Sequence, residues 1–167
     1  MLTPAQLSTL KALILADPAL NAHPNNADGN LAIAQALAAI ASPDYWVWRS
    51  FVSDQEMYEG TGDGGTSWSW SSYISRSQGE RDAWRQMVNM AGGLNPSLAN
   101  VRAGIADIFS GAGGASQRTH LLAVGRRKAN RAEKLFATGT GSTASPATMT
   151  VEGTLSGDDV QAARNLP

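Results

Sequence analysis

Helix start and stop signals constrain the fold of this chain more than any other feature of its sequence. Thr3 precedes Pro4, a residue suited to the first helical position, and Gln6 completes a capping box with Thr3. Asp17 precedes Pro18 and ends this helix, because a residue before proline is disfavoured in the helical region. The sequence therefore predicts a first helix between Thr3 and Asp17.

Similar signals recur along the chain and predict a mainly α-helical protein. Ser77 and Glu80 form a second capping box, Gly92 suits a helix C-terminus, and Asn95-Pro96 suits another helix start. Further helices are expected over about 30–40, 77–92, 95–109 and 115–136. We expect a four- to five-helix bundle in a body of residues 1–137, with an arm at about 43–76 and a tail at 138–167.

The predicted arm is extended, aromatic and rich in glycine. Trp46 and Trp48 share one face of an extended segment, Trp68 and Trp70 share one face of another, and Gly60–Gly65 lies between them. The two flanks could pair as a β-hairpin, or the region could be an irregular arm that orders only on assembly. Four tryptophans are hard to bury within a small arm, and aromatic side chains are typical interface anchors. We therefore expect these four residues at a partner interface.

A basic helix is predicted over residues 118–134. It carries one acidic residue, Glu133, beside the cations Arg118, Arg126, Arg127, Lys128, Arg131 and Lys134. Arg127, Arg131 and Lys134 have the spacing of a single helix face. Because arginine pairs well with carboxylates, we expect Arg126 and this face to meet an acidic partner surface. Non-specific nucleic-acid binding is the alternative, since clustered cations also contact phosphates.

The last thirty residues are expected to form an extended C-terminal tail. The uncharged tract Thr138–Thr148 is interpreted as a tether, and it leads to a short strand at Met149–Val151 and a small capped helix at Ser156–Asn165. The tip of this tail is expected to dock on a partner through the apolar residues Met149, Val151, Leu155 and Val160. Deletion of residues 138–167 is then expected to leave the helical body folded.

Composition narrows the class of protein further. The net charge of −1 and the pI near 6.1 give no overall attraction to nucleic acid or to an anionic membrane. The chain has no cysteine, so it can form neither a disulfide nor a Cys-ligated metal site. No secretory signal is evident, and the longest apolar run, Leu31–Ala41, is much shorter than the roughly 20 residues that span a bilayer.

No motif predicts catalysis. His23 and His120 are isolated in the sequence and fit no metal-binding spacing. The acidic residues at 54, 56, 59 and 63 could offer oxygen ligands to Ca²⁺ or Mg²⁺, but they match no loop of defined geometry and are better interpreted as a solvated acidic segment. Gly111–Gly114 lacks the lysine of a phosphate-binding loop. We expect no enzyme activity, cofactor or metal.

Several segments together resemble a recurring type of tailed-bacteriophage structural protein. They are Leu2–Leu20, Ala41–Arg49, Phe109–Gly114, Arg131–Ser142, Ser145–Ser156 and Asp159–Asn165. The resemblance covers nearly the whole chain, and the segment Gln55–Arg81 departs from it. It implies a virion structural protein, and specifically a head-to-tail connector (adaptor) subunit.

Connector subunits of this type imply a particular set of partners. The resemblance implies a dodecameric ring beneath the portal protein, with the C-terminal tail along the portal subunits and a tail or nozzle component on the other side. DNA would pass through the channel without sequence-specific contact, and no membrane is involved. The expected location is the head–tail junction of the virion, after synthesis in the host bacterial cytoplasm. The alternatives are another tail or baseplate protein and a nucleic-acid-binding protein.

Overall fold

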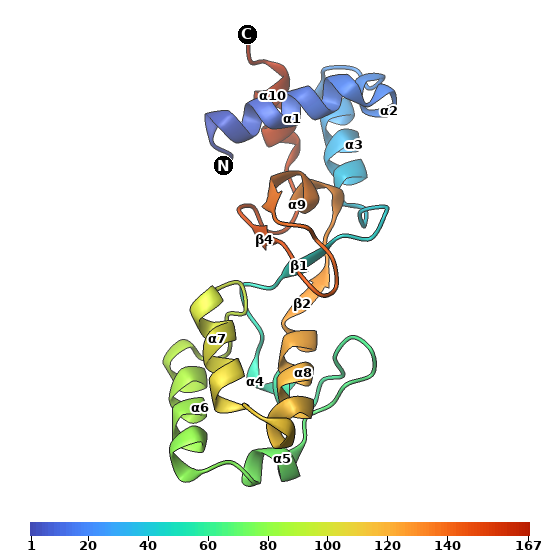
Figure 1. The fold of residues 1–167 in the computed structure, drawn as a ribbon. Helices are drawn as coiled ribbons and strands as arrows, with labels where there is room; N and C mark the ends of the chain where they lie inside the picture. The colour runs from blue at the N-terminus through green and yellow to red at the C-terminus, as the bar shows by residue number, and fades with distance from the viewer. The chain divides into compact units, whose positions relative to one another are not determined.

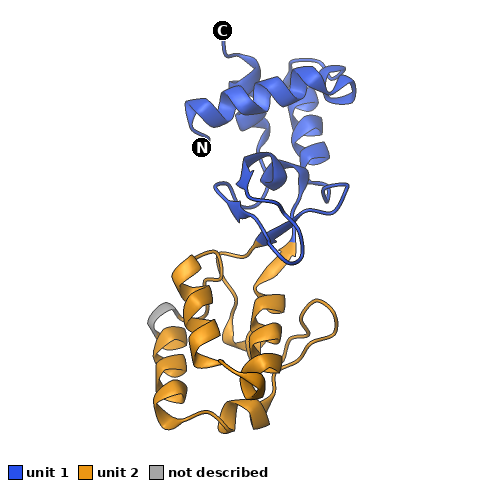
Figure 2. Cartoon of the chain, viewed as in Figure 1, with its two compact units in different colours: residues 1–47, 128–167 blue, residues 48–127 orange. Residues whose placement is uncertain are grey.

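The chain is mostly helical and divides into two compact units. The structure, a computed structural model, describes residues 1–89 and 92–167. Unit 1 comprises residues 1–47 and 128–167, and unit 2 comprises residues 48–127 (Figure 2). The expected division into a body of 1–137 and a tail of 138–167 differs from this arrangement, because the C-terminal residues pack with the N-terminal helices.

Unit 1 consists of short helices and small pieces of strand (Figure 1). Its helices are α1 (Pro4–Ala16), α2 (Pro18–Asn21), α3 (Ala27–Ala38), α9 (Arg131–Phe136) and α10 (Gly157–Arg164). Its small sheet pairs β3 (Ala137–Thr138) antiparallel with β4 (Thr148–Met149), with Ala137 opposite Met149. The strands β1 (Trp46–Trp48) and β2 (Arg126–Lys128) form a second two-stranded sheet, and the chain leaves unit 1 within β1 and returns within β2.

The predicted capping box places the first helix, α1, correctly. The Thr3 side chain accepts a hydrogen bond from the Gln6 backbone, and the Gln6 side chain returns one to Thr3. Asp17 ends α1 and its carboxylate caps α2, which the sequence interpretation did not expect. The helix predicted from residue 30 begins earlier, at Ala27, because Asn26 caps the Gly29 backbone amide. Local hydrogen bonds thus determine where these helices begin and end.

The C-terminal helix α10 is part of the core of unit 1 and packs against α1 and α3 (Figure 1). Val160 and Ala163 are fully buried in one cluster with Leu10, Ile14 and Leu37. The expectation of an extended tail is therefore wrong for this helix. The Ser156–Asp159 capping box sets the start of α10, and burial of its apolar face holds it in the unit.

The uncharged tract is likewise bound to the rest of unit 1 and is not a free tether. The Trp46 amide donates to the Gly141 carbonyl over 2.7 Å, and the Ala147 amide donates to the Trp46 carbonyl over 2.9 Å. The Tyr45 hydroxyl donates to the Gly139 carbonyl over 2.9 Å. Backbone groups that water would satisfy in a tether are satisfied here by β1 and its neighbours. Deletion of residues 138–167 would therefore remove part of the core, contrary to the expectation of a dispensable tail.

Unit 2 is an aromatic-centred helical unit. Its elements are α4 (Asp54–Tyr58), α5 (Trp70–Ile74), α6 (Gln78–Ala91), α7 (Ala99–Ile108), the 3₁₀ turn η1 (Ala112–Gly114) and α8 (Ala115–Val124). Ser77 and Glu80 form the expected capping box, and Gly92 ends α6 in the left-handed conformation. The core gathers Trp68, Trp84 and Phe109, with the rings of Trp84 and Phe109 5.3 Å apart.

The predicted hairpin arm is not formed in unit 2. The strand containing Trp48 pairs with residues 126–128, while Trp70 begins a helix capped by Ser69. Within residues 43–76, all of which the structure describes, only the turn joining Gly62 and Thr66 resembles a hairpin. The alternation of Trp68 and Trp70 predicts a strand, but Trp68 is buried in the core and Trp70 begins a helix on which it is exposed.

The predicted long basic helix is interrupted. Helix α8 ends at Val124, residues 126–128 form β2, and α9 begins after Asn130. Arg127, Arg131 and Lys134 therefore do not share one helix face. A side chain at Gly125 would come within 2.9 Å of Pro96, so only glycine fits this break. The predicted helix start at Asn95-Pro96 is also wrong. The Asn95 side-chain oxygen accepts hydrogen bonds from the Ser97 backbone amide and hydroxyl, and α7 begins later, at Ala99.

Candidate partner interface

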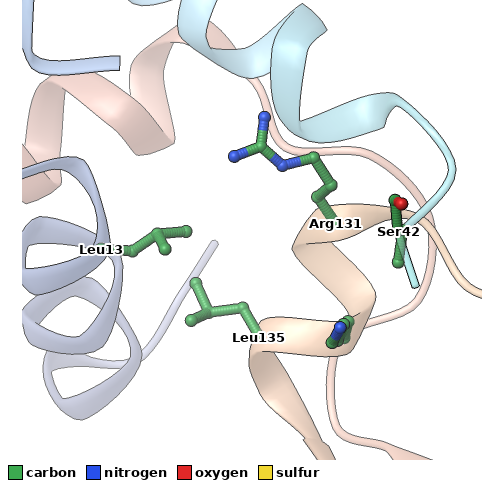
Figure 3. Close-up of a pocket in the computed structure, with 6 residues that line it drawn as sticks. Leu13, Ser42, Arg131 and Leu135 are labelled. Carbon is green, nitrogen blue, oxygen red and sulfur yellow. The ribbon is translucent and has the colours of Figure 1, made fainter. Parts of the chain in front are cut away.

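A groove with apolar and cationic walls lies on unit 1 between α1 and α9. It has a volume of about 380 Å³ and is lined by Leu13, Ala41, Ser42, Arg131, Lys134 and Leu135. Leu13 from α1 and Leu135 from α9 point toward one another across it (Figure 3). Two of the cations predicted at the interface, Arg131 and Lys134, therefore come together here. Such a surface suits an apolar side chain that is accompanied by acidic groups.

The two cations of the groove have different partners within the chain. Arg131 donates to the Asp17 carboxylate over 2.7 Å, and this hydrogen bond lowers the pKa of Asp17 below its ordinary value. The Lys134 ammonium lies 5.5 Å from the centre of the Tyr45 ring, in the range of a cation–π contact. A ring leaves the ammonium protons able to bind an incoming carboxylate. Lys134 is therefore the better candidate for recognition of an acidic partner.

Of the other predicted cations, three form β2, and Arg118 lies on α8, where it donates to the Phe109 carbonyl. Arg126 forms an ion pair with Asp63 at 3.2 Å, and Lys128 forms one with Asp44 at 2.7 Å. Arg127 is half-buried and also interacts within the chain. These partners reduce the charge available to an external ligand. The structure thus does not bring Arg126 and Arg127 into the groove with Arg131 and Lys134.

The four predicted interface tryptophans occupy different environments. Trp68 is only 9% exposed, and Trp48 is equally buried with the Arg102 guanidinium over its ring. Trp46 is half-buried on unit 1, within 6.0 Å of the Lys128 ammonium. Trp70 is 57% exposed. Of the four, Trp70 is the one placed as an interface anchor would be.

Trp70 belongs to a small exposed patch on α5 of unit 2. Ile74 follows it by four residues on the same helix face and is 66% exposed. The Trp70 ring stacks on the ring of Tyr58, with centroids 5.8 Å apart and planes inclined by 17°. This stacking holds the indole in one orientation at the surface. The patch therefore presents a preorganised apolar anchor.

The predicted tip residues of the C-terminal segment are largely internal. Leu155 and Val160 are buried in the unit 1 core, while Met149 and Val151 are half-buried against it. In the folded unit these side chains stabilise the segment itself. Its exposed residues are instead mostly polar or small and include Asp158, Gln161 and Ala162.

The polar residues considered for chemistry have structural partners. His120 is fully buried, with Nε2 2.8 Å from the Met57 carbonyl oxygen. Glu56 caps α4 and pairs with Arg49; the Ser53 backbone amide is the main cause of its lowered pKa. Within residues 1–89 and 92–167, no group of His, Asp and Glu side chains could hold a metal ion. No helix in the described part of the chain is long and apolar enough to cross a membrane.

The groove also contains residues that the sequence interpretation did not assign to a site. Leu13 and Leu135 fall within segments predicted only as helices, and Ser42 follows the helix predicted over about 30–40. The capping pair Asn130 and Glu133 was the available signal, because it places a helix start at Arg131 and separates α9 from α8. Which helices face one another across the groove depends on tertiary packing.

Comparisons of the chain with protein-family models, curated proteins and solved structures found no match.

Proposed function

We propose that this protein is a structural subunit of a tailed-bacteriophage virion and acts as a head-to-tail connector (adaptor). The proposal rests on the segments that resemble such proteins and on one structural observation. Each compact unit has a surface suited to a partner: the basic, apolar groove on unit 1 and the exposed Trp70 and Ile74 on unit 2. A connector joins unlike neighbours, so it requires surfaces of unlike chemistry.

The proposed subunit forms a ring under the portal protein, with a tail or nozzle component on the opposite side. Arg131 and Lys134 suit an acidic protein surface, whereas Trp70 and Ile74 suit an apolar pocket. Because α10 is buried against α1 and α3, the C-terminal segment would contact the portal as part of folded unit 1. This modifies the expectation of a loose tail that docks by itself.

The nucleic-acid alternative has less support than the connector proposal. It required a continuous basic face on residues 118–134, and the break at Gly125 removes that face. Ion pairs to Asp17, Asp44 and Asp63 also neutralise three of the cations. Cations that are already paired release fewer counterions from DNA.

The decisive experiment mixes the protein with the portal protein encoded in the same genome and weighs the complexes by native mass spectrometry. We expect a portal oligomer that carries multiple copies of this chain. Lys134→Glu and Trp70→Ala test the two surfaces, and Asp107→Ala, at an exposed position, serves as the control. Wild-type protein that leaves the portal unbound under all salt conditions would overturn the connector proposal.

A further inference from the structure

The Tyr45 ring lies under the Lys134 ammonium, and a turn of the uncharged tract fixes this ring in place. The Tyr45 hydroxyl donates to the Gly139 carbonyl over 2.9 Å. A Cβ atom added to Gly141 would be only 2.1 Å from the ring, so only the bare backbone of a glycine fits beside it. Gly141 also has a φ of +67°, which favours glycine. The ring is therefore held at two points by residues far away in the sequence.

No carboxylate of this chain occupies the Lys134 ammonium. Lys134 is half-buried on α9, and within residues 1–89 and 92–167 its ammonium forms no hydrogen bond or ion pair. The Tyr45 ring, 5.5 Å away, is the group that attracts it. A lysine without such a contact samples many rotamers, and ordering it when a ligand binds lowers the affinity. A ring that orders the lysine beforehand removes this penalty.

We infer that Tyr45 is a positioning residue: together with the turn Gly139–Gly141 it orients Lys134 to receive a carboxylate in the groove between α1 and α9. The inference rests on the proposed function in one respect, because an acidic protein surface is the ligand proposed for this groove. An aliphatic side chain of that ligand lies between Leu13 and Leu135, and its neighbouring carboxylate meets the ammonium. The uncharged tract thereby contributes to recognition without contacting the ligand.

The contact between ring and lysine is measured in the free protein by NMR. Ring currents should displace the Lys134 Hε signals upfield of those of Lys11, which has no ring contact in the described part of the chain. Tyr45→Phe keeps the ring and should retain the displacement, whereas Tyr45→Leu should abolish it. Leucine preserves apolar packing against the cluster of Val47 and Ala129, so the unit should stay folded. Unchanged Lys134 signals in Tyr45→Leu would overturn the inference.

Two glycine substitutions test the turn separately. Gly141→Ala drives a methyl group into the Tyr45 ring and should also remove the displacement of the Lys134 signals. Gly64→Ala is the matched control, because Gly64 has a similar φ of +78°, yet its added Cβ meets no described atom within 4 Å beyond its chain neighbours. It should leave the lysine signals unchanged. A displacement that survives in Gly141→Ala overturns the role of the turn.

Recognition is tested by titrating the full chain with a short acidic peptide, acetyl-Asp-Leu-Asp-amide. Tyr45→Phe should bind this peptide within about twofold of the wild-type affinity, and Tyr45→Leu about fivefold more weakly, because its lysine must be ordered on binding. In a Lys134→Met background, Tyr45→Leu should cause no further loss, since the two residues act as a pair. Equal affinities of the wild type and Tyr45→Leu contradict the positioning role. Circular dichroism confirms that each variant is folded.

The outcomes separate this positioning role from the proposed function, because neither the NMR signals nor the peptide affinities require the portal protein. If both follow the expectation while the wild type leaves the portal unbound, the positioning role stands and the connector proposal is wrong. If the wild type binds the portal but Tyr45→Leu binds the peptide as tightly as the wild type does, the connector proposal stands and the positioning role is wrong.

Discussion

Arg131 Nη2 donates a hydrogen bond to Asp17 Oδ2 over 2.7 Å, and this contact joins the start of α9 to the junction of α1 and α2. Asp17 also accepts from the Ala19 backbone amide over 3.0 Å, so a single carboxylate caps one helix and holds another. The groove between α1 and α9 therefore depends on a residue that the sequence identifies only as a helix end.

Acid should weaken the fold through carboxylates of this kind. Hydrogen bonds from Arg131, from the Ser53 backbone and from the Ser77 hydroxyl are the leading causes of lowered pKa values at Asp17, Glu56 and Glu80. A pKa that is lower in the folded state means that the unfolded chain binds protons more readily. The free energy of unfolding should therefore be steady near neutral pH and fall below about pH 4. Urea unfolding across this range measures it, and Asp17→Asn should flatten the decline.

Glu133→Ala should destabilise unit 1. Glu133 is almost fully buried, accepts from the Asn130 amide over 3.0 Å and accepts from the Gly153 amide over 2.8 Å. Its removal leaves one buried and one half-buried amide without their acceptor, at a cost of about 1–3 kcal/mol in unfolding free energy. Glu133→Gln, which keeps an acceptor oxygen, should cost less. Equal unfolding midpoints for the wild type and Glu133→Ala in chemical denaturation would contradict this role.

Val160→Ala tests whether α10 is part of the unit 1 core. Val160 is fully buried, so losing two methyl groups should lower the unfolding free energy by about 2 kcal/mol. Gln161→Ala, at the neighbouring exposed position, should change it by no more than about 0.5 kcal/mol. A C-terminal segment that was extended in solution would make the two variants equally stable.

Trp68→Ala and Trp70→Ala should separate stability from binding. Trp68 lies in the unit 2 core and contacts the rings of Tyr58, Trp84 and others, so its truncation should cost about 3–5 kcal/mol. Truncation of the exposed Trp70 removes its stacking on Tyr58 and its edge contacts with Trp68 and Tyr73, each worth about 0.5–1.5 kcal/mol. We expect Trp70→Ala to remain folded and to lose partner binding. Thermal unfolding measures the stability of each variant, and mixing with the portal protein measures its binding. A folded Trp70→Ala variant with unchanged binding would exclude the patch as an anchor.

Aromatic spacing was a poor guide to this site because a period of two residues is not specific to strands. Trp68 and Trp70 lie two apart in the sequence, yet Trp70 begins a helix and Trp68 fills the core. The prediction of one basic helix over residues 118–134 was wrong for a related reason. Residues 115–136 have apolar residues at helical spacing throughout, yet α8 ends at Val124, and the next residue, Gly125, lies so close to Pro96 that an added Cβ would be 2.9 Å from the proline ring. Spacing along the chain carries no information on such a contact.

The sequence by itself determined the helical class and several helix ends. The boxes at Thr3 and Ser77 and the cap at Gly92 form as predicted, because their hydrogen bonds join residues only a few positions apart. Tertiary structure decided the strand pairing of residues 46–48 with 126–128 and the burial of α10 against α1 and α3. It also decided which cations and leucines meet in the groove. These features depend on which distant apolar faces bury one another, and a local pattern states only that a face is apolar, not which other face covers it.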